Sequence, residues 1–239
     1  MSKKHLQNLH VLFPCLHDDT KQAYDALVSS FELFTQSLRV KAILITSTQP
    51  REGKSTVATN LSAALSLTGK NILLLDGDTR KPKIHELLKL PNTVGFTDIL
   101  HGTMGVRDVI QHFSTSITTK NPMESLNLSV ITSGPSTSSF SDPKAAARLT
   151  EAFEYLKNIY DVVVVDAPPV LAVNDALVFA RLTDFVLFVI GAGLVKEADA
   201  KRAKSRLEQA GAKNLSLVMN FFDSTVHGPS PHPFSAYYR

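Results

Sequence analysis

The sequence predicts an α/β fold in which a mostly parallel, doubly wound sheet is covered by helices on both faces. Short runs rich in Val, Ile and Leu are apolar at successive positions, which is typical of strands buried on both sides. Segments with helical periodicity separate these runs, and such alternation favours a parallel sheet. At 239 residues, of which 44% are hydrophobic, the chain suits one large domain.

The expected elements alternate along the chain. The expected helices are Lys21–Phe34, Gly53–Leu67, Pro143–Asn158 and Lys196–Ala210. Gly69 and Gly211 stand just beyond two of these helices, where a glycine commonly ends a helix. The expected strands are Val40–Ser47, Asn71–Asp76, Leu126–Thr132, Tyr160–Asp166, Phe185–Ile190 and Leu215–Asn220.

The two ends of the chain differ in composition from the middle. We expect residues 1–18 to be a loosely ordered lead-in, 19–223 to form the domain, and 224–239 to be a flexible tail. The N-terminus lacks the apolar core of a secretory signal, and the longest apolar stretch is too short to span a bilayer. The single cysteine, Cys15, suits a reducing compartment. A cytoplasmic protein without direct membrane insertion is therefore expected.

Charge and histidine placement argue against two other classes of protein. The formal net charge of +3 is spread along the chain without a basic run, so nucleic acid is not an expected partner. The eight histidines show no metal-ligand spacing, and His101 and His112 are expected on surface helices. A histidine-based metal centre is not expected.

The strongest local motif is Gly53-Lys54-Ser55, which follows an expected strand and opens an expected helix. In this context backbone N–H groups and the helix N-terminus hold phosphates, the lysine reaches the β- and γ-oxygens, and the serine hydroxyl binds Mg²⁺. A capped helix start is the alternative reading, because Thr48 stands where the full pattern has Gly or Ala. The expected nucleotide-binding residues are Thr48, Gln49, Pro50, Arg51, Glu52, Gly53, Lys54, Ser55 and Thr56.

Carboxylates stand at the ends of two further apolar runs. Asp76 directly follows the apolar run Ile72–Leu75, and Asp166 directly follows the run Val162–Val165. Ligands of open α/β sheets bind at the carboxyl ends of the strands, and a buried carboxylate is costly unless it is paired or bound to metal. Aspartate also begins many ordinary turns, but the order of the three motifs favours a P-loop nucleotide site. The expected Mg²⁺ site combines Ser55, Asp76 and Asp166.

Several blocks resemble the cytoplasmic domains of bacterial tyrosine kinases of capsule and exopolysaccharide synthesis, relatives of the MinD/ParA ATPases. The most specific are Asp76-Gly-Asp-Thr-Arg-Lys-Pro82 and Asp166-Ala-Pro-Pro169. Thr93–Leu100 and Ile131–Pro135, with Asp142-Pro143, resemble further family blocks. The resemblance covers about residues 20 to 222.

The resemblance implies ATP and Mg²⁺ as cofactors and assigns roles by position. Lys54, Asp76, Asp78 and Arg80 would be the catalytic residues. Asp78 or Asp76 would lie near the attacking tyrosine hydroxyl and accept its proton, while Arg80 and Lys81 would neutralise charge on the transferred phosphoryl group, unless they form a solvated turn.

The resemblance also implies contacts at the end of the chain. Asn220, at the end of the last strand, would contact adenine, although asparagine there is also an ordinary turn former. Tyr237 and Tyr238 in the tail would be the phosphoacceptors, because Tyr155 and Tyr160 resemble packing residues.

Two departures from the family pattern bear on assembly and on the loop. A Glu-x-x-Arg-x-x-Arg pattern supports ring assembly in the family, and its positions here hold Gln22, Asp25 and Val28. This weighs against a ring but leaves a homo-oligomer open. Arg51 replaces a common glycine of the loop and either reaches the γ-phosphate or points to solvent.

Three functions remain to be distinguished. The first is an ATP-dependent tyrosine autokinase that regulates polysaccharide synthesis or export, working with a separate membrane-embedded activator that brings it to the inner membrane. The second is an ATP-binding switch that phosphorylates nothing. The third, a partitioning ATPase of the MinD/ParA kind, is least favoured, because such proteins usually carry an additional lysine where Gln49 and Pro50 stand here.

Overall fold

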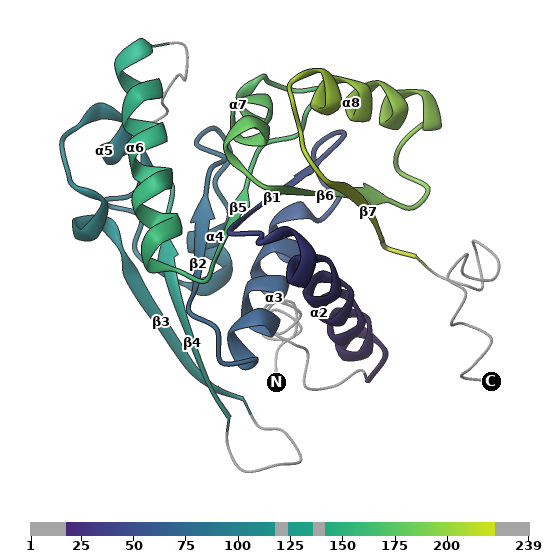
Figure 1. The fold of residues 1–239 in the computed structure, drawn as a ribbon, viewed down its shortest axis with the longest axis horizontal. Coiled ribbons are helices and arrows are strands. Elements are labelled where there is room, and N and C mark those ends of the chain that lie inside the picture. Colours follow the sequence, from purple (N-terminus) through teal and green to yellow (C-terminus); the bar gives the residue numbers. More distant parts are fainter. Residues whose placement is uncertain (1–17, 118–123, 136–141, 223–239) are drawn as a thin grey trace, which may run out of the picture.

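A seven-stranded sheet with helices on both faces forms the centre of the computed structural model, which describes residues 18–117, 124–135 and 142–222 (Figure 1). The strands are β1 (Ala42–Ser47), β2 (Ile72–Asp76), β3 (Gln111–Ile117), β4 (Glu124–Ile131), β5 (Val162–Asp166), β6 (Phe185–Gly191) and β7 (Leu215–Asn220). The helices are α2 (Asp18–Leu38), α3 (Lys54–Leu67), α4 (Ile84–Leu88), α5 (Phe96–His101), α6 (Pro143–Ile159), α7 (Asp175–Leu182) and α8 (Glu197–Gln209), with a 3₁₀ turn, η1 (Val106–Val109).

The strand order is β3-β4-β2-β5-β1-β6-β7, and neighbouring strands are parallel except for β3 and β4. The β1 strand therefore lies inside the sheet, between β5 and β6. In the register of β2 and β5, Asp76 is the partner of Asp166. The carboxyl ends of β1, β2 and β5 consequently meet at one edge, as expected for a ligand site in an open sheet.

The core has two halves because successive side chains of a strand point to opposite faces of the sheet. Leu44, Leu73 and Val163 face the layer of α5, α6, α7 and α8. Their neighbours, such as Leu74 and Val164, face α2, α3 and α4. Figure 1 shows α2 and α3 on one side of the strands and α7 and α8 on the other. This arrangement confirms the predicted doubly wound fold.

All six predicted strands and four predicted helices are present, with ends shifted by a few residues. The sequence reasoning gave no bounds for α4, α5, α7 or β3. The β3 strand is Gln-His-Phe-Ser-Thr-Ser-Ile, which lacks an apolar run because it lies at the sheet edge and pairs with only β4. His101 lies at the end of α5 as expected, but the prediction of a helix at His112 was wrong, since this residue lies in β3.

The α2 helix covers one face through a narrow apolar stripe. Val28 and Phe31 are buried, and the ring of Phe31 meets that of Phe185 edge-on at 5.9 Å between centroids. Gln22 and Asp25 are exposed. Val28, at one of the positions of the family's charged pattern, thus belongs to the core.

Candidate active site

The segment between β1 and α3 forms a tight loop whose last residue is Gly53. Gly53 has a φ of 84° and caps α3. A Cβ at this position would lie 2.0 Å from Nδ2 of Asn220, so both the backbone angle and the available space require glycine. Arg51 is exposed and also has a positive φ, of 72°.

Glu52 holds this loop from inside. Its side chain is buried, Oε1 accepts a hydrogen bond from the N–H of Gln49 at 2.6 Å, and Oε2 accepts one from the N–H of Gly191 at 2.9 Å. The side chain of Asn220 donates to the Glu52 carbonyl at 3.0 Å. The loop is therefore fixed to the ends of β6 and β7, as a preorganised binding site requires.

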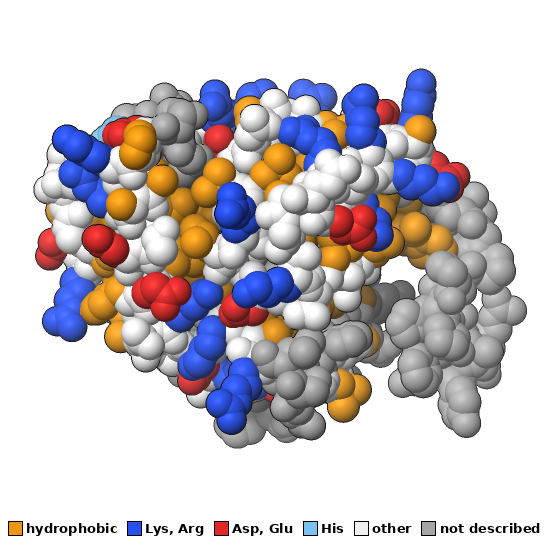
Figure 2. Space-filling view, turned by 45° about the horizontal axis from the view of Figure 1, so that its top comes forward, with side chains coloured by type: hydrophobic (Ala, Val, Ile, Leu, Met, Phe, Trp, Pro, Cys, Tyr) orange, Lys and Arg blue, Asp and Glu red, His pale blue; other side chains and the backbone are white. Residues whose placement is uncertain are grey.

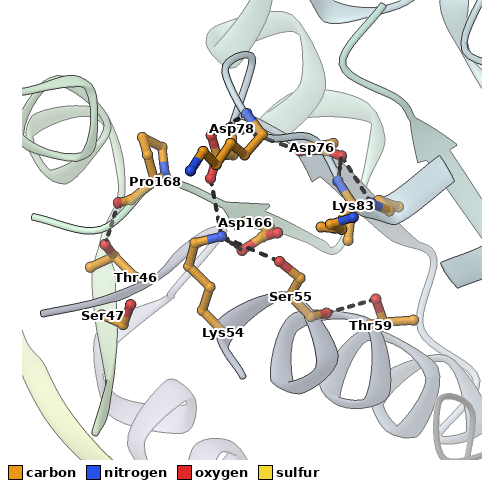
Figure 3. A network of polar contacts seen from close by, with 12 residues as sticks. Thr46, Ser47, Lys54, Ser55, Thr59, Asp76, Asp78, Lys83, Asp166 and Pro168 are labelled. Atoms are coloured by element: carbon orange, nitrogen blue, oxygen red, sulfur yellow. Dashed lines mark hydrogen bonds and ion pairs between the residues drawn. The ribbon is translucent and has the colours of Figure 1, made fainter. Parts of the chain in front are cut away.

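Lys54 is the centre of the charged cluster in Figure 3. Its Nζ lies 3.1 Å from Oδ2 of Asp78 and 3.7 Å from Oδ1 of Asp166, and donates to Oγ of Ser55 at 3.3 Å. Burial disfavours the charge on Lys54, but the carboxylates of Asp166 and Asp78 outweigh it and raise the pKa of the amine. The lysine is therefore a firmly charged cation directed at the strand ends.

Asp76 organises the loop that follows β2. Its Oδ2 accepts hydrogen bonds from the backbone N–H groups of Lys83 and Ile84, each at 3.0 Å, and Oδ1 accepts one from Asp78 at 3.2 Å. Burial and the nearby charge of Asp166 raise the pKa of Asp76 to about 7. Most of its acceptor capacity is thus used inside the protein.

Asp166 has the opposite surroundings. The residue is fully buried, and among the described residues neither carboxylate oxygen accepts a well-formed hydrogen bond. Burial raises the pKa of this carboxyl group, and the charge of Lys54 opposes the rise. Buried acceptors without partners are rare and call for an explanation. A hard cation such as Mg²⁺, which prefers oxygen ligands, fits this site beside the Ser55 hydroxyl.

Gly77 and Asp78 bring the β2 loop against β5. The N–H of Gly77 donates to the Asp166 carbonyl at 2.8 Å, and a Cβ on Gly77 would lie 2.8 Å from the ring of Phe179. Asp78 is buried, and its Oδ1 accepts from the N–H of Lys81 at 3.0 Å. The glycine between the two aspartates therefore permits the close approach that directs Asp78 to Lys54.

Arg80 lies at the rim of the site and is paired with a residue that the sequence reasoning missed. Its Nε lies 3.3 Å from Oδ2 of Asp175, the first residue of α7. Burial raises the pKa of Asp175, and Arg80 opposes the rise. Asn174 and Asp175 precede an apolar run, which is typical of a helix start, so the sequence could have predicted a helix beginning here but not the pairing with Arg80. Lys81 is exposed.

The structure thus brings together most of the predicted site residues. Lys54, Ser55, Asp76, Asp78 and Asp166 form one cluster at the carboxyl edge of the sheet, with Asn220 at the far side of the loop. Tyr160 is buried in the core and Tyr155 packs against it, as expected. The predicted acceptors, with the rest of 224–239, and the lead-in up to residue 17 lie outside the described residues.

Comparison with known proteins identifies the family. Residues 40–192 match the AAA domain family AAA_31. The tyrosine-protein kinase YwqD of Bacillus subtilis is 32% identical over 199 residues, which are 83% of this chain and 80% of that protein. The chain belongs to the bacterial tyrosine kinase family. A second relative, the putative tyrosine-protein kinase CapB of Staphylococcus aureus, is 31% identical over 86% of this chain and 87% of its own.

Solved structures agree with this family membership. The kinase domain of the Escherichia coli tyrosine kinase ETK matches with a TM-score of 0.76 and 27% identity, covering 92% of this chain and 86% of that one. MinD of Pyrococcus horikoshii, complexed with Mg-ADP, shares the fold with a TM-score of 0.58 and 23% identity over 75% of this chain and 69% of its own. This member of the family thus has the P-loop ATPase fold.

Other blocks of this family member also meet in the structure. The N–H groups of Phe96 and Thr97 donate to the carbonyls of Thr132 and Ser133, which joins two of the blocks that resemble the family.

Within the described ranges, no helix combines the length and apolarity needed to cross a bilayer. The same residues contain no cluster of three or more His, Cys, Asp and Glu side chains suited to a metal.

Proposed function

We propose that this family member is an ATP-dependent protein-tyrosine autokinase that regulates capsule or exopolysaccharide synthesis or export. The observation that carries the proposal is the convergence of Lys54, the first residue of α3, with the buried carboxylates of Asp78 and Asp166 beside the phosphate loop. The names of the relatives above, a tyrosine-protein kinase and a putative one, support the kinase part of the proposal.

In the proposed complex the loop from Thr48 to Thr56 surrounds the phosphates of ATP. Its backbone N–H groups and the N-terminus of α3 provide the positive end of a dipole, and Lys54 contacts the β- and γ-oxygens. Asn220 contacts the adenine.

The proposed Mg²⁺ ligands are Ser55 and Asp166, and Asp76 belongs to the outer shell because its oxygens already accept backbone hydrogen bonds. When bound, the ion neutralises charge on the β- and γ-phosphates. Asp166 supplies unsatisfied oxygens to this site, and the Ser55 hydroxyl lies at the start of α3.

In the proposed transfer, Asp78 is first released from its ion pair with Lys54. Phosphate oxygens compete for the Lys54 ammonium, which is 3.1 Å from Asp78 in the structure. The released carboxylate then accepts the proton of the tyrosine hydroxyl. A bond forms between the tyrosine oxygen and the γ-phosphorus, the bond from that phosphorus to the bridging oxygen breaks, and ADP leaves. Arg80, supported by Asp175, neutralises charge on the transferred group.

The proposed acceptors are Tyr237 and Tyr238, reached in a second copy of the chain. A separate membrane-embedded activator would bring the kinase to the inner membrane, and the kinase would function as a homo-oligomer when activated.

One observation favours the second function, an ATP-binding switch. The positions of the assembly pattern hold the exposed Gln22 and Asp25 and the buried Val28, so the charge pairing of that interface is missing.

Phosphosite mapping after incubation with Mg·ATP tests the proposal. We expect phosphate on Tyr237 or Tyr238 of the purified full chain, increased when it is copurified with its membrane partner. The Lys54→Met variant should lose both labelling and ATP binding, and a variant with both tyrosines changed to Phe should lose labelling alone. Label on serine or threonine only, or ATP binding without label in every preparation, would refute the kinase and leave the switch.

A further inference from the structure

The β7 strand, at the edge of the sheet, carries a row of exposed apolar side chains. Leu217, Met219 and the following Phe221 alternate along the chain, and each exposes about half of its surface, at 55%, 52% and 53%. Figure 2 shows hydrophobic side chains at the surface on the right of the molecule, in the region of β7. Of the three residues, Phe221 is the one that follows Asn220 directly and so lies nearest to the phosphate loop.

The backbone at Phe221 turns its ring toward the phosphate loop. Its φ is 57°, in the left-handed region that non-glycine residues seldom adopt and that is enriched at functional sites. Atom Cζ of the ring lies 3.2 Å from the place that a Cβ on Gly53 would occupy, and the Asn220 amide lies closer still. In a regular strand these two neighbours would point to opposite faces. The turn places both beside Gly53.

Because the loop fixes the phosphates, the adenosine part of ATP must extend away from Gly53 along the protein surface. The end of β7 offers a planar aromatic face and an amide there, which are the two groups that recognise a purine, by stacking and by hydrogen bonding. A half-exposed phenyl ring remains partly in water until a planar apolar ligand covers it.

We propose that Phe221 is the platform on which the adenine base stacks, with the Asn220 amide at the edge of the base. This inference rests on the proposed nucleotide site and adds a residue that holds the base of the nucleotide. Leu217 and Met219, farther back along the same exposed row, have no part in it. Stacking of this kind changes affinity by about tenfold when the ring is removed.

The absence of tryptophan from the sequence permits a direct test. In Phe221→Trp the new indole is the only tryptophan, and we expect its fluorescence to change on titration with Mg·ADP at an affinity close to that of the wild type. Leu217→Trp is the matched control, because it places an indole in the same exposed row four residues earlier. Its fluorescence should not respond.

A second measurement separates base contacts from phosphate contacts. Calorimetry should show Phe221→Ala binding Mg·ADP about tenfold more weakly than the wild type, with unchanged affinity for inorganic tripolyphosphate. Equal Mg·ADP affinity in wild type and Phe221→Ala, or equal weakening for tripolyphosphate, would overturn the inference while the kinase proposal stands. Failure of the wild type to bind Mg·ADP would overturn both. Circular dichroism and urea unfolding confirm that each variant is folded.

Discussion

Replacing Asp166 by Asn should stabilise the metal-free protein and strongly weaken its binding of Mg·ATP. The carboxylate is fully buried, and among the described residues neither of its oxygens accepts a well-formed hydrogen bond, although Lys54 and Ser55 lie close enough to favour its charged form. Asn has nearly the same volume and no charge. A residue that destabilises the metal-free fold and serves only to bind a ligand should, when it is replaced, increase the stability and decrease the ligand affinity. A residue kept for packing should not.

The magnitude follows from two opposing terms. At 3.7 Å and an effective dielectric constant near 20, Lys54 attracts Asp166 by about 4 kcal/mol. Burial of a carboxylate costs several kcal/mol, and repulsion by Asp78 adds to it. Since the pKa of Asp166 is raised, the unfavourable terms exceed the attraction. Lys54 also keeps Asp78 as a partner at 3.1 Å in the variant. We expect a gain of about 1–3 kcal/mol in the free energy of unfolding.

Urea unfolding in EDTA at pH 8, with Mg·ATP affinity measured in parallel, provides the assay. The midpoint should rise without a change in slope, which reports stability rather than a change in the unfolded state. Affinity for Mg·ATP should fall by at least about 100-fold. Asp161→Asn is the control at the other end of β5, where an oxygen can still accept from Asn71, and it should change neither quantity appreciably. A lower midpoint for Asp166→Asn would refute the reasoning.

Three further predictions concern the same site. Because the folded protein retains the Asp76 proton up to about pH 7, while the unfolded chain releases it near 3.8, metal-free stability relative to Asp76→Asn should fall between these pH values by up to about 1.4 kcal/mol per pH unit, and then level off; a difference that is constant with pH contradicts the assignment. Glu52→Gln places an amide donor against a backbone N–H, so stability should drop by about 1–3 kcal/mol and ATP affinity should weaken, measured by unfolding and calorimetry; a variant equal to wild type in both would show that the loop does not need this brace. Gly77→Ala forces a methyl group toward Phe179, so it should lose about 1–3 kcal/mol in urea unfolding, and no loss would mean that the loop moves freely.

The parallel part of the fold could be predicted from the sequence because its strands are buried on both faces. Runs such as Val162–Val165 leave few alternatives, and Asp166 at the end of the run marks the ligand edge. The partners of each carboxylate could not be predicted. Asp76 and Asp166 look alike as strand ends, but only the fold shows that three backbone N–H groups satisfy the first and that the second lacks them.

Other features were missed because tertiary contacts create them. The β3 strand has a polar sequence that becomes a strand by pairing with β4 at the edge. The five-residue helix α4 and the six-residue helix α5 are too short for a periodic signal. The pairing of Arg80 with Asp175 joins residues 95 positions apart, and Phe221 faces Gly53 only because of its left-handed backbone.

The central place of β1 in the sheet has a consequence for how the kinase acquires its ligand. Lys54, Asp78 and Asp166 follow strands that are widely separated in sequence and adjacent only in the finished sheet. Such long-range pairings form late, after slow loop closure. A partly folded chain therefore lacks the binding site for a triphosphate. The amount of nucleotide bound by newly synthesised protein would then report the fraction of molecules in which the sheet is complete.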